Sequence, residues 1–242
     1  MSPSKREREY ARRRYQRYQQ HVTETRVKRR LQRQTAASIL AVLVLVLGVS
    51  LTVGLAGNGG ATPKPSKTYT LPKPAAAQGR TWTGKITTNV GAIGFTLVGS
   101  AAPQAVASFV SLARQGFFDG TRCHRLATGI KVLQCGDPTG TGGGGPGYTF
   151  GPVENAPASN VYPAGTIAMA RKGGDGASMG SQFFLVYEDT TIPADPAGGY
   201  TVFGRITSGL DVVTAVADAG VRGGGLDGPP ATGVTIQGVE TQ

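Results

Sequence analysis

Apolar residues at helical spacing predict two helices in the C-terminal two thirds of the chain. In the segment APQAVASFVSLARQG they recur every three or four residues, at Val106, Phe109, Val110 and Ala113. Pro103 suits the first turn of this helix, and Gly116 suits its C-terminal end. The segment LDVVTAVADA, which follows Gly209, predicts the second helix.

Strand-like runs between glycine-rich turns are more numerous than helices. They are expected at TWTGKITT and GAIGFTLV, near residues 121–126, 131–135, 165–170, 182–187 and 201–206, and at GVTIQGVE. Two helices cannot cover a parallel sheet by repeated crossovers. The pattern therefore predicts a mainly β fold, a closed eight-stranded antiparallel barrel capped by two α-helices.

The N-terminal part of the chain has a different pattern. Residues 1–35 contain twelve Lys and Arg against three Glu, so they carry +9 of the formal net charge of +11. The rest of the chain is nearly neutral, so the overall charge gives no reason to expect a nucleic-acid partner. We interpret this tail as a topology signal attracted to the cytoplasmic leaflet, with direct binding of RNA or anionic lipid as the weaker alternative.

Residues 36–57, AASILAVLVLVLGVSLTVGLAG, form an uncharged apolar run long enough to cross a bilayer core about 30 Å thick as a helix. The basic flank predicts a cytoplasmic N-terminus. A cleaved signal peptide is the competing interpretation, but its apolar region is usually only about 7–15 residues long. We expect an uncleaved transmembrane anchor, then a Pro-rich linker at 58–80 and one folded domain at 81–242.

The glycine-rich stretch GDPTGTGGGGPGY is a candidate phosphate site. Gly140, Gly142 and Gly145 match G-x-G-x-x-G, but a Pro-Gly pair follows in place of a helix, and the Gly-Lys-Ser/Thr of a P-loop is absent. We interpret it as a surface loop. Outside the tail His124 is the single histidine, and no C-x-x-C occurs, so neither a metal nor another cofactor is expected.

The segment TRCHRLATGIKVLQCGD has the composition of a hairpin, yet it places Arg125 and, nine residues later, Gln134 among Leu, Ile and Val. A strand arginine taken alone is usually a solvated charge. Here the surrounding motifs are FFDGTRCHRLATGIKVLQCGDPTGTGGGGPGY, GTIAMARKGGDGASMGSQFFLVY and YTVFGRITSGLDVV. With these motifs, residues 81–242 resemble the cyclophilin family of peptidyl-prolyl cis-trans isomerases.

The resemblance implies a mechanism and a set of site residues. Arg125 would hydrogen-bond the prolyl nitrogen of a twisted X-Pro amide, and Gln134 would help to fix it. The remaining residues would form a pocket for the proline ring (Val132, Phe184 and either Ile130 or Lys131), contacts to the peptide backbone (Ala170, Arg171 and Gln182) and a rim (Ile192 and Tyr200). No nucleophile, metal or proton transfer is required.

Several positions depart from the family's pattern. One extra residue in the hairpin leaves Ile130 and Lys131 as alternatives for a pocket wall that is Phe in the family. Arg171 stands where Asn is frequent, and Tyr200 stands where His is frequent. Ile192 falls where the family has the tryptophan that contacts the inhibitor cyclosporin, so weak inhibition is expected. These changes suggest an altered, slower isomerase.

Cys123 and Cys135 flank the same hairpin. In an exported domain they would meet an oxidising environment that permits a disulfide. Regular strand alternation, however, puts them on opposite faces unless the extra residue forms a bulge. A disulfide and two unpaired buried thiols both stay open at this point.

We expect a membrane-anchored isomerase whose domain lies outside the cytoplasm and assists the folding of exported proteins. Its expected partners are proline-containing segments of those proteins, and it is expected to be a monomer. The alternative is a non-catalytic module that binds proline segments or acts as a scaffold at the membrane.

Overall fold

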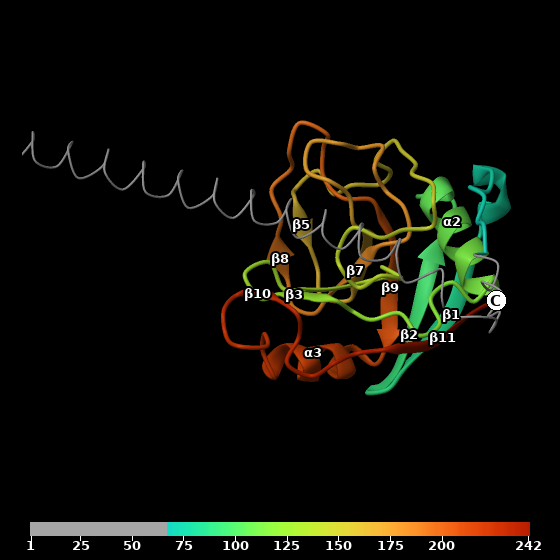
Figure 1. Cartoon of the computed structure of the whole chain (residues 1–242). Coiled ribbons are helices and arrows are strands. Elements are labelled where there is room, and N and C mark those ends of the chain that lie inside the picture. Colours follow the sequence, from blue (N-terminus) through green and yellow to red (C-terminus); the bar gives the residue numbers. More distant parts are fainter. Residues whose placement is uncertain (1–66) are drawn as a thin grey trace, which may run out of the picture. The chain divides into compact units, whose positions relative to one another are not determined.

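The computed structural model describes residues 67–242, whose arrangement is shown in Figure 1. The predicted tail at 1–35 and the predicted anchor at 36–57 lie outside the described residues and stay predictions. Within residues 67–242, no helix is both long enough and apolar enough to cross a bilayer.

A strongly curled antiparallel sheet is the main regular element of the described residues (Figure 1). Its nine strands are, in spatial order, β10 (Asp227–Gly228), β3 (Arg125–Ala127), β4 (Val132–Cys135), β7 (Phe183–Val186), β6 (Thr166–Met169), β9 (Val202–Ser208), β2 (Gly91–Val98), β1 (Thr81–Thr88) and β11 (Ile236–Thr241). A separate two-stranded sheet consists of β5 (Val161–Tyr162) and β8 (Thr190–Thr191). The predicted count of eight strands is therefore wrong, because strands of two residues show no alternation that a sequence pattern can reveal.

Backbone hydrogen bonds join β11, at one end of this order, to the segment that precedes β3, near the other end. Arg122 forms a bridge with Thr235. The Cys123 N–H donates to the carbonyl of Val234 at 3.0 Å, and the Ile236 N–H donates to the carbonyl of Thr121 at 2.8 Å. We describe the sheet as a curled half-barrel. Its two ends are linked by these few bonds, and it does not form the closed barrel that the pattern predicted.

The two predicted helices are confirmed as α2 (Pro103–Arg114) and α3 (Leu210–Asp218). Phe109 of α2 is the centre of an aromatic cluster, with its ring centroid 5.0–5.8 Å from those of Phe95, Phe118, Phe183 and Phe203. No side chain of the preceding residue caps α2. Instead the Glu154 carboxylate accepts hydrogen bonds from the N–H groups of Gln104 and Ala105, both at 3.0 Å, which satisfies two of the unpaired donors of the first turn.

The structure of residues 67–80 differs from the extended linker that was predicted for 58–80. A short 3₁₀-helix, η1 (Pro74–Ala77), buries Ala77 completely, and the Trp82 indole N–H donates to the Ala77 carbonyl at 2.9 Å. Tyr69 and Leu71 also pack against the core. Because these apolar groups leave water on contact with the core, the described part of 58–80 belongs to the folded unit.

The strands β3, β4, β6 and β7 separate two apolar clusters. Side chains such as Leu133, Phe183 and Leu185 point into the main core. Their neighbours along the strands, including Val132 and Phe184, point to the opposite face. We call this second group the site cluster: Ala127, Val132, Tyr162, Ala168, Phe184, Val186 and Ile192, flanked by Ile130, Ala170, Tyr200 and Val202. Because successive side chains of a strand point to opposite sides of the sheet, each of these short strands contributes to both clusters.

Candidate active site

Strand register places four side chains in one row across the sheet. Arg125 on β3 lies opposite Gln134 on β4, Gln134 lies opposite Phe184 on β7, and Phe184 lies opposite Ala168 on β6. Directly opposed residues of antiparallel strands share a face. The guanidinium, one amide and the apolar site cluster therefore occupy the same face of the sheet.

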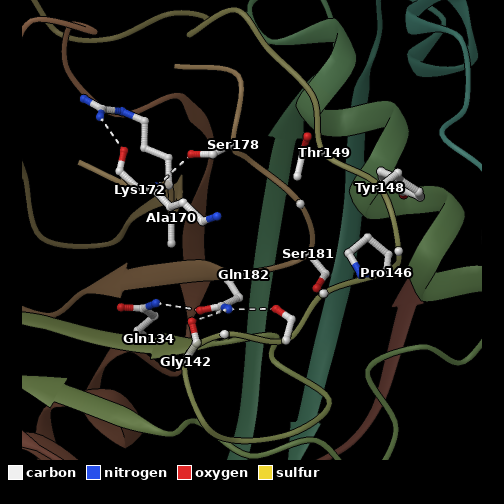
Figure 2. Close-up of a pocket in the computed structure, with 16 residues that line it drawn as sticks. Gln134, Gly142, Pro146, Tyr148, Thr149, Ala170, Lys172, Ser178, Ser181 and Gln182 are labelled. Carbon is white, nitrogen blue, oxygen red and sulfur yellow. Dashed lines mark hydrogen bonds between the residues drawn. The ribbon is translucent and has the colours of Figure 1, made fainter. Parts of the chain in front are cut away.

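A chain of hydrogen bonds fixes the two amides beside Arg125. The Arg125 Nη1 donates to Gln134 Oε1 at 3.0 Å, and Gln134 Nε2 donates to Gln182 Oε1 at 2.8 Å. Gln182 Nε2 in turn donates to the carbonyls of Gly142 and Gly144, at 3.0 and 2.8 Å (Figure 2). In this series of hydrogen bonds both amide oxygens accept a hydrogen bond and both amide nitrogens donate one, so each amide is held in one orientation.

A second partner of Arg125 comes from β10. Its Nε donates to Asp227 Oδ1 at 2.8 Å, and its Nη2 donates to Asp227 Oδ2 at 2.6 Å. This hydrogen-bonded carboxylate raises the pKa of Arg125, and the guanidinium lowers the pKa of Asp227. Sequence reasoning missed Asp227, because it lies 102 residues from Arg125 in a glycine-rich stretch without any motif.

The two side chains predicted as alternatives for the pocket wall have different surroundings. Ile130 packs against the site cluster, whereas the Lys131 ammonium lies 3.1 Å from a carboxylate oxygen of Glu188. Lys131 has a left-handed backbone with a φ of 55°, in the turn just before β4. Phe184 is only 4% exposed, and the Tyr200 ring meets it edge-on with the centroids 5.4 Å apart. Ile192, expected at the rim, is buried within the cluster.

The glycine-rich loop borders an open cavity of about 550 Å³ next to this row (Figure 2). It is lined by Gln134, residues 142–149, residues 170–172, Ser178 and residues 180–182. The loop is held from inside by Asp137, whose carboxylate accepts from the N–H groups of Thr139 and Gly142 at 2.7 and 2.6 Å. Its backbone donors thus point at a carboxylate of the same chain. A Cβ at Gly144 would lie 2.0 Å from Asp137 Oδ1, so this close approach requires glycine.

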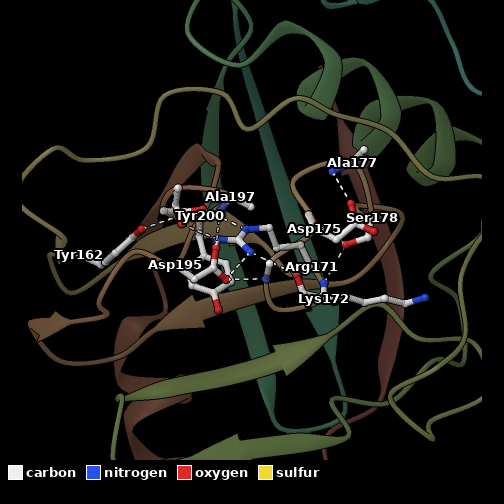
Figure 3. Close-up of polar contacts among 12 residues, drawn as sticks. Tyr162, Arg171, Lys172, Asp175, Ala177, Ser178, Asp195, Ala197 and Tyr200 are labelled. Carbon is white, nitrogen blue, oxygen red and sulfur yellow. Dashed lines mark hydrogen bonds and ion pairs between the residues drawn. The ribbon is translucent and has the colours of Figure 1, made fainter.

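Arg171 holds a neighbouring loop (Figure 3). Its guanidinium is fully buried and forms a two-pronged ion pair with Asp195, at 2.8 and 2.9 Å. The remaining N–H groups donate to the carbonyls of Lys172, Gly198 and Gly199, and the guanidinium carbon lies 4.7 Å from the centroid of the Tyr200 ring. All five donors are satisfied within the protein. The side chain expected to contact a peptide backbone therefore anchors the loop that carries Tyr200.

Cys123 and Cys135 form a disulfide, which settles the alternatives that the sequence left open. Both residues are buried in the main core beneath Arg125 and Gln134. Cys123 lies between the bridge of Arg122 with Asp137 and the first residue of β3, outside the regular ladder. Strict alternation fails at this irregular step, so both sulfurs reach the same side.

The curled sheet with two helices and the face that joins Arg125 to an apolar cluster define a cyclophilin-like protein. A model of the family described as "Cyclophilin type peptidyl-prolyl cis-trans isomerase/CLD" matches residues 83–241, and the chain belongs to this family.

Individual relatives agree with this assignment. The chain is 52% identical over 165 residues to "Probable peptidyl-prolyl cis-trans isomerase B" of Mycobacterium tuberculosis, covering 63% of this chain and 52% of that protein. It is 43% identical over 130 residues to "Peptidyl-prolyl cis-trans isomerase B" of Bacillus subtilis, covering 53% of this chain and 85% of the relative. The chain thus spans about half the length of the mycobacterial relative that it matches.

The fold is also similar to a crystal structure of a cyclophilin-type isomerase from Cryptosporidium parvum, determined in the presence of the dipeptide Ala-Pro. The TM-score is 0.56 at 27% sequence identity, and the alignment covers 66% of this chain and 98% of that one.

Proposed function

We propose that the protein is a peptidyl-prolyl cis-trans isomerase that acts on X-Pro bonds of exported proteins at the membrane. The observation that carries the proposal is the single face on which the Arg125 guanidinium and Gln134 border the apolar site cluster. The family assignment and the Ala-Pro dipeptide studied with the Cryptosporidium relative support the same substrate class.

The chemistry needs only differential binding. Rotation about an X-Pro bond must break amide resonance, with a barrier of about 18–20 kcal/mol. In the twisted transition state the prolyl nitrogen regains a lone pair, and an N–H of Arg125 that bonds this lone pair stabilises the twisted amide more than the planar one. Because arginine stays charged and its donors are rigidly arranged, it suits this role.

The apolar neighbours of Arg125 would hold the proline ring. In this proposal the ring contacts Phe184 and Val132 beside Ile130, with Tyr200 at the rim. Gln182 and Ala170 line the adjacent cavity and would bind the peptide on the other side of the X-Pro bond.

The first test is the cis-to-trans rate of an Ala-Ala-Pro-Phe anilide in a protease-coupled assay with the purified full chain in mild detergent. We expect acceleration, and a loss of about a hundredfold or more in kcat/KM for Arg125→Ala. Arg205→Ala is the matched control, because Arg205 is an exposed strand arginine on β9, four strands away from Arg125 in the order of the sheet.

A folded wild-type chain that binds the peptide without accelerating isomerisation would refute catalysis. That result would establish the rival function, a module that grips proline segments or acts as a membrane scaffold. Equal activity of Arg125→Ala and wild type would instead refute the assigned role of the guanidinium.

The proposed location rests on residues 36–57 and on the disulfide. An apolar run preceded by twelve basic residues predicts a single-pass anchor with a cytoplasmic N-terminus. The pairing of Cys123 with Cys135 is typical of oxidising compartments. Alkaline phosphatase fused to the C-terminus should be active in cells, and a cytoplasmic reporter fused there should not. The opposite result would overturn the proposed orientation.

A further inference from the structure

The carboxylate of Asp227 is built into the site by the C-terminal part of the chain. Figure 1 shows β10 beside β3, and Asp227 lies directly opposite Ala127 in that ladder. Arg125 is two residues from Ala127 on β3, so Arg125 and Asp227 are diagonal neighbours on one face, within reach of long side chains. Thr128 secures the position, since its N–H and hydroxyl both donate to the Leu226 carbonyl, at 2.8 and 3.2 Å.

The geometry divides the donors of Arg125 into two sets. A guanidinium has five N–H donors. Asp227 accepts two of them, from Nε and Nη2, and Gln134 accepts one, from Nη1. Two N–H groups therefore stay unassigned within the described residues, one on each terminal nitrogen. They are sufficient for one bond to the prolyl nitrogen and one to a neighbouring carbonyl of a substrate.

The two hydrogen bonds from Arg125 to Asp227, which we call the fork, also restrict how the guanidinium can move. Arg125 has a side chain that is 39% exposed, and without Asp227 only the single bond to Gln134 would hold its head group. A free arginine side chain samples many rotamers, and this rotational freedom is lost when its head group is fixed. A two-pronged bond removes rotation about the last bonds of the side chain before the substrate arrives.

We propose that Asp227 is a positioning residue for the isomerase reaction, which fixes the Nε and Nη2 edge of Arg125 and leaves its two unassigned N–H groups available to the twisted amide. The inference rests on the proposed function. The opposite role, a carboxylate that competes with substrate for the guanidinium, is disfavoured because the two unassigned N–H groups do not require the fork to open.

The test compares Asp227→Asn, Asp227→Glu and wild type as full chains, with rates measured over a range of substrate concentrations. Asp227→Asn should lower kcat about tenfold, equivalent to about 1.4 kcal/mol, with KM changed less than twofold. Asp227→Glu keeps the carboxylate and should restore kcat to within about threefold of wild type. Glu240→Gln is the matched control, because Glu240 pairs with Lys85 at 3.6 Å on β1 and β11 and touches no site residue.

A spectroscopic signature separates positioning from general stabilisation. In ¹⁵N-labelled chain the Arg125 Nε–H signal, assigned by its loss in Arg125→Lys, should be sharp and slow to exchange in wild type and in Asp227→Glu. It should broaden or exchange rapidly in Asp227→Asn while the thermal midpoint changes by less than about 3 °C.

The outcomes are distinct. An inactive wild type would refute the proposed function itself. An active wild type with an equal or faster Asp227→Asn would overturn the positioning role, and a faster variant would identify Asp227 as a competitor of the substrate. Parallel losses of activity and stability with an unchanged Nε–H signal would also overturn it, since Asp227 would then be merely structural.

Discussion

Replacing Asp137 by Asn tests how the glycine-rich loop is held. The Asp137 side chain is completely buried and accepts from the N–H and hydroxyl of Thr139 and from the N–H groups of Gly142 and Gly144. Burial alone would raise the pKa of this carboxyl, but the hydrogen bonds outweigh burial and lower the pKa from 3.8 to about 2. The ionised form is therefore stabilised by folding.

The pKa difference sets the size of the effect. A fall from 3.8 to about 2 corresponds to about 2.4 kcal/mol of unfolding free energy at neutral pH. Because the folded pKa is the lower one, this contribution is complete above about pH 5 and disappears as the pH falls through about 2. At pH 3 roughly 1.3 kcal/mol of it should be left.

Urea denaturation of wild type and Asp137→Asn at pH 6 and pH 3 isolates this carboxylate. Other acid-sensitive groups, such as Asp195 and Asp227, titrate in both proteins and cancel in the difference. The stability advantage of wild type should narrow by about 1 kcal/mol between the two pH values. A difference that stays constant within about 0.3 kcal/mol would refute the reasoning, because Asp137 would then have an ordinary pKa.

Three further predictions concern the surroundings of the site. Reduction of the Cys123–Cys135 disulfide should lower the unfolding free energy by about 3 kcal/mol in urea titrations, and alkylation of the unreduced, unfolded chain followed by mass measurement should find no free thiol. Phe184→Ala should raise KM in the peptide assay about tenfold, since the proline ring loses its main apolar contact; an unchanged KM would place the proline elsewhere. Arg171→Lys should lower the thermal midpoint by roughly 5–10 °C, because an ammonium cannot satisfy Asp195 and three carbonyls in one plane; an unchanged midpoint would show that the two-pronged ion pair is not needed.

Local patterns were sufficient for both helices and the longer strands, and the resemblance to the family pointed to Arg125 and Gln134. Both helices and the long strands β1 and β2 follow from apolar periodicity, because each element buries one side of its own sequence. Arg125 and Gln134 were expected to be neighbours, and the short hairpin between them does bring them opposite each other. Segments of two residues, such as β10, carry no periodic signal.

Some local uncertainties depended on the path of the backbone. One extra residue in the hairpin left Ile130 and Lys131 equivalent in sequence, and the left-handed turn at Lys131 separates them. The pairing of the cysteines likewise depended on an irregular step before β3 that the spacing of residues does not reveal.

By itself the sequence determined the helices, the longer strands and the family motifs, because these depend on periods of two or 3.6 residues and on short segments. The tertiary structure alone decided the distant partners: Asp227 on Arg125, Asp195 on Arg171, and Glu154 at the start of α2. Each of these carboxylates is at least 24 residues away from the groups it binds. An Asp or Glu is an ordinary surface residue wherever it occurs in a sequence. Only the folding of the chain brings its carboxylate next to a buried or fixed N–H group from which it accepts a hydrogen bond.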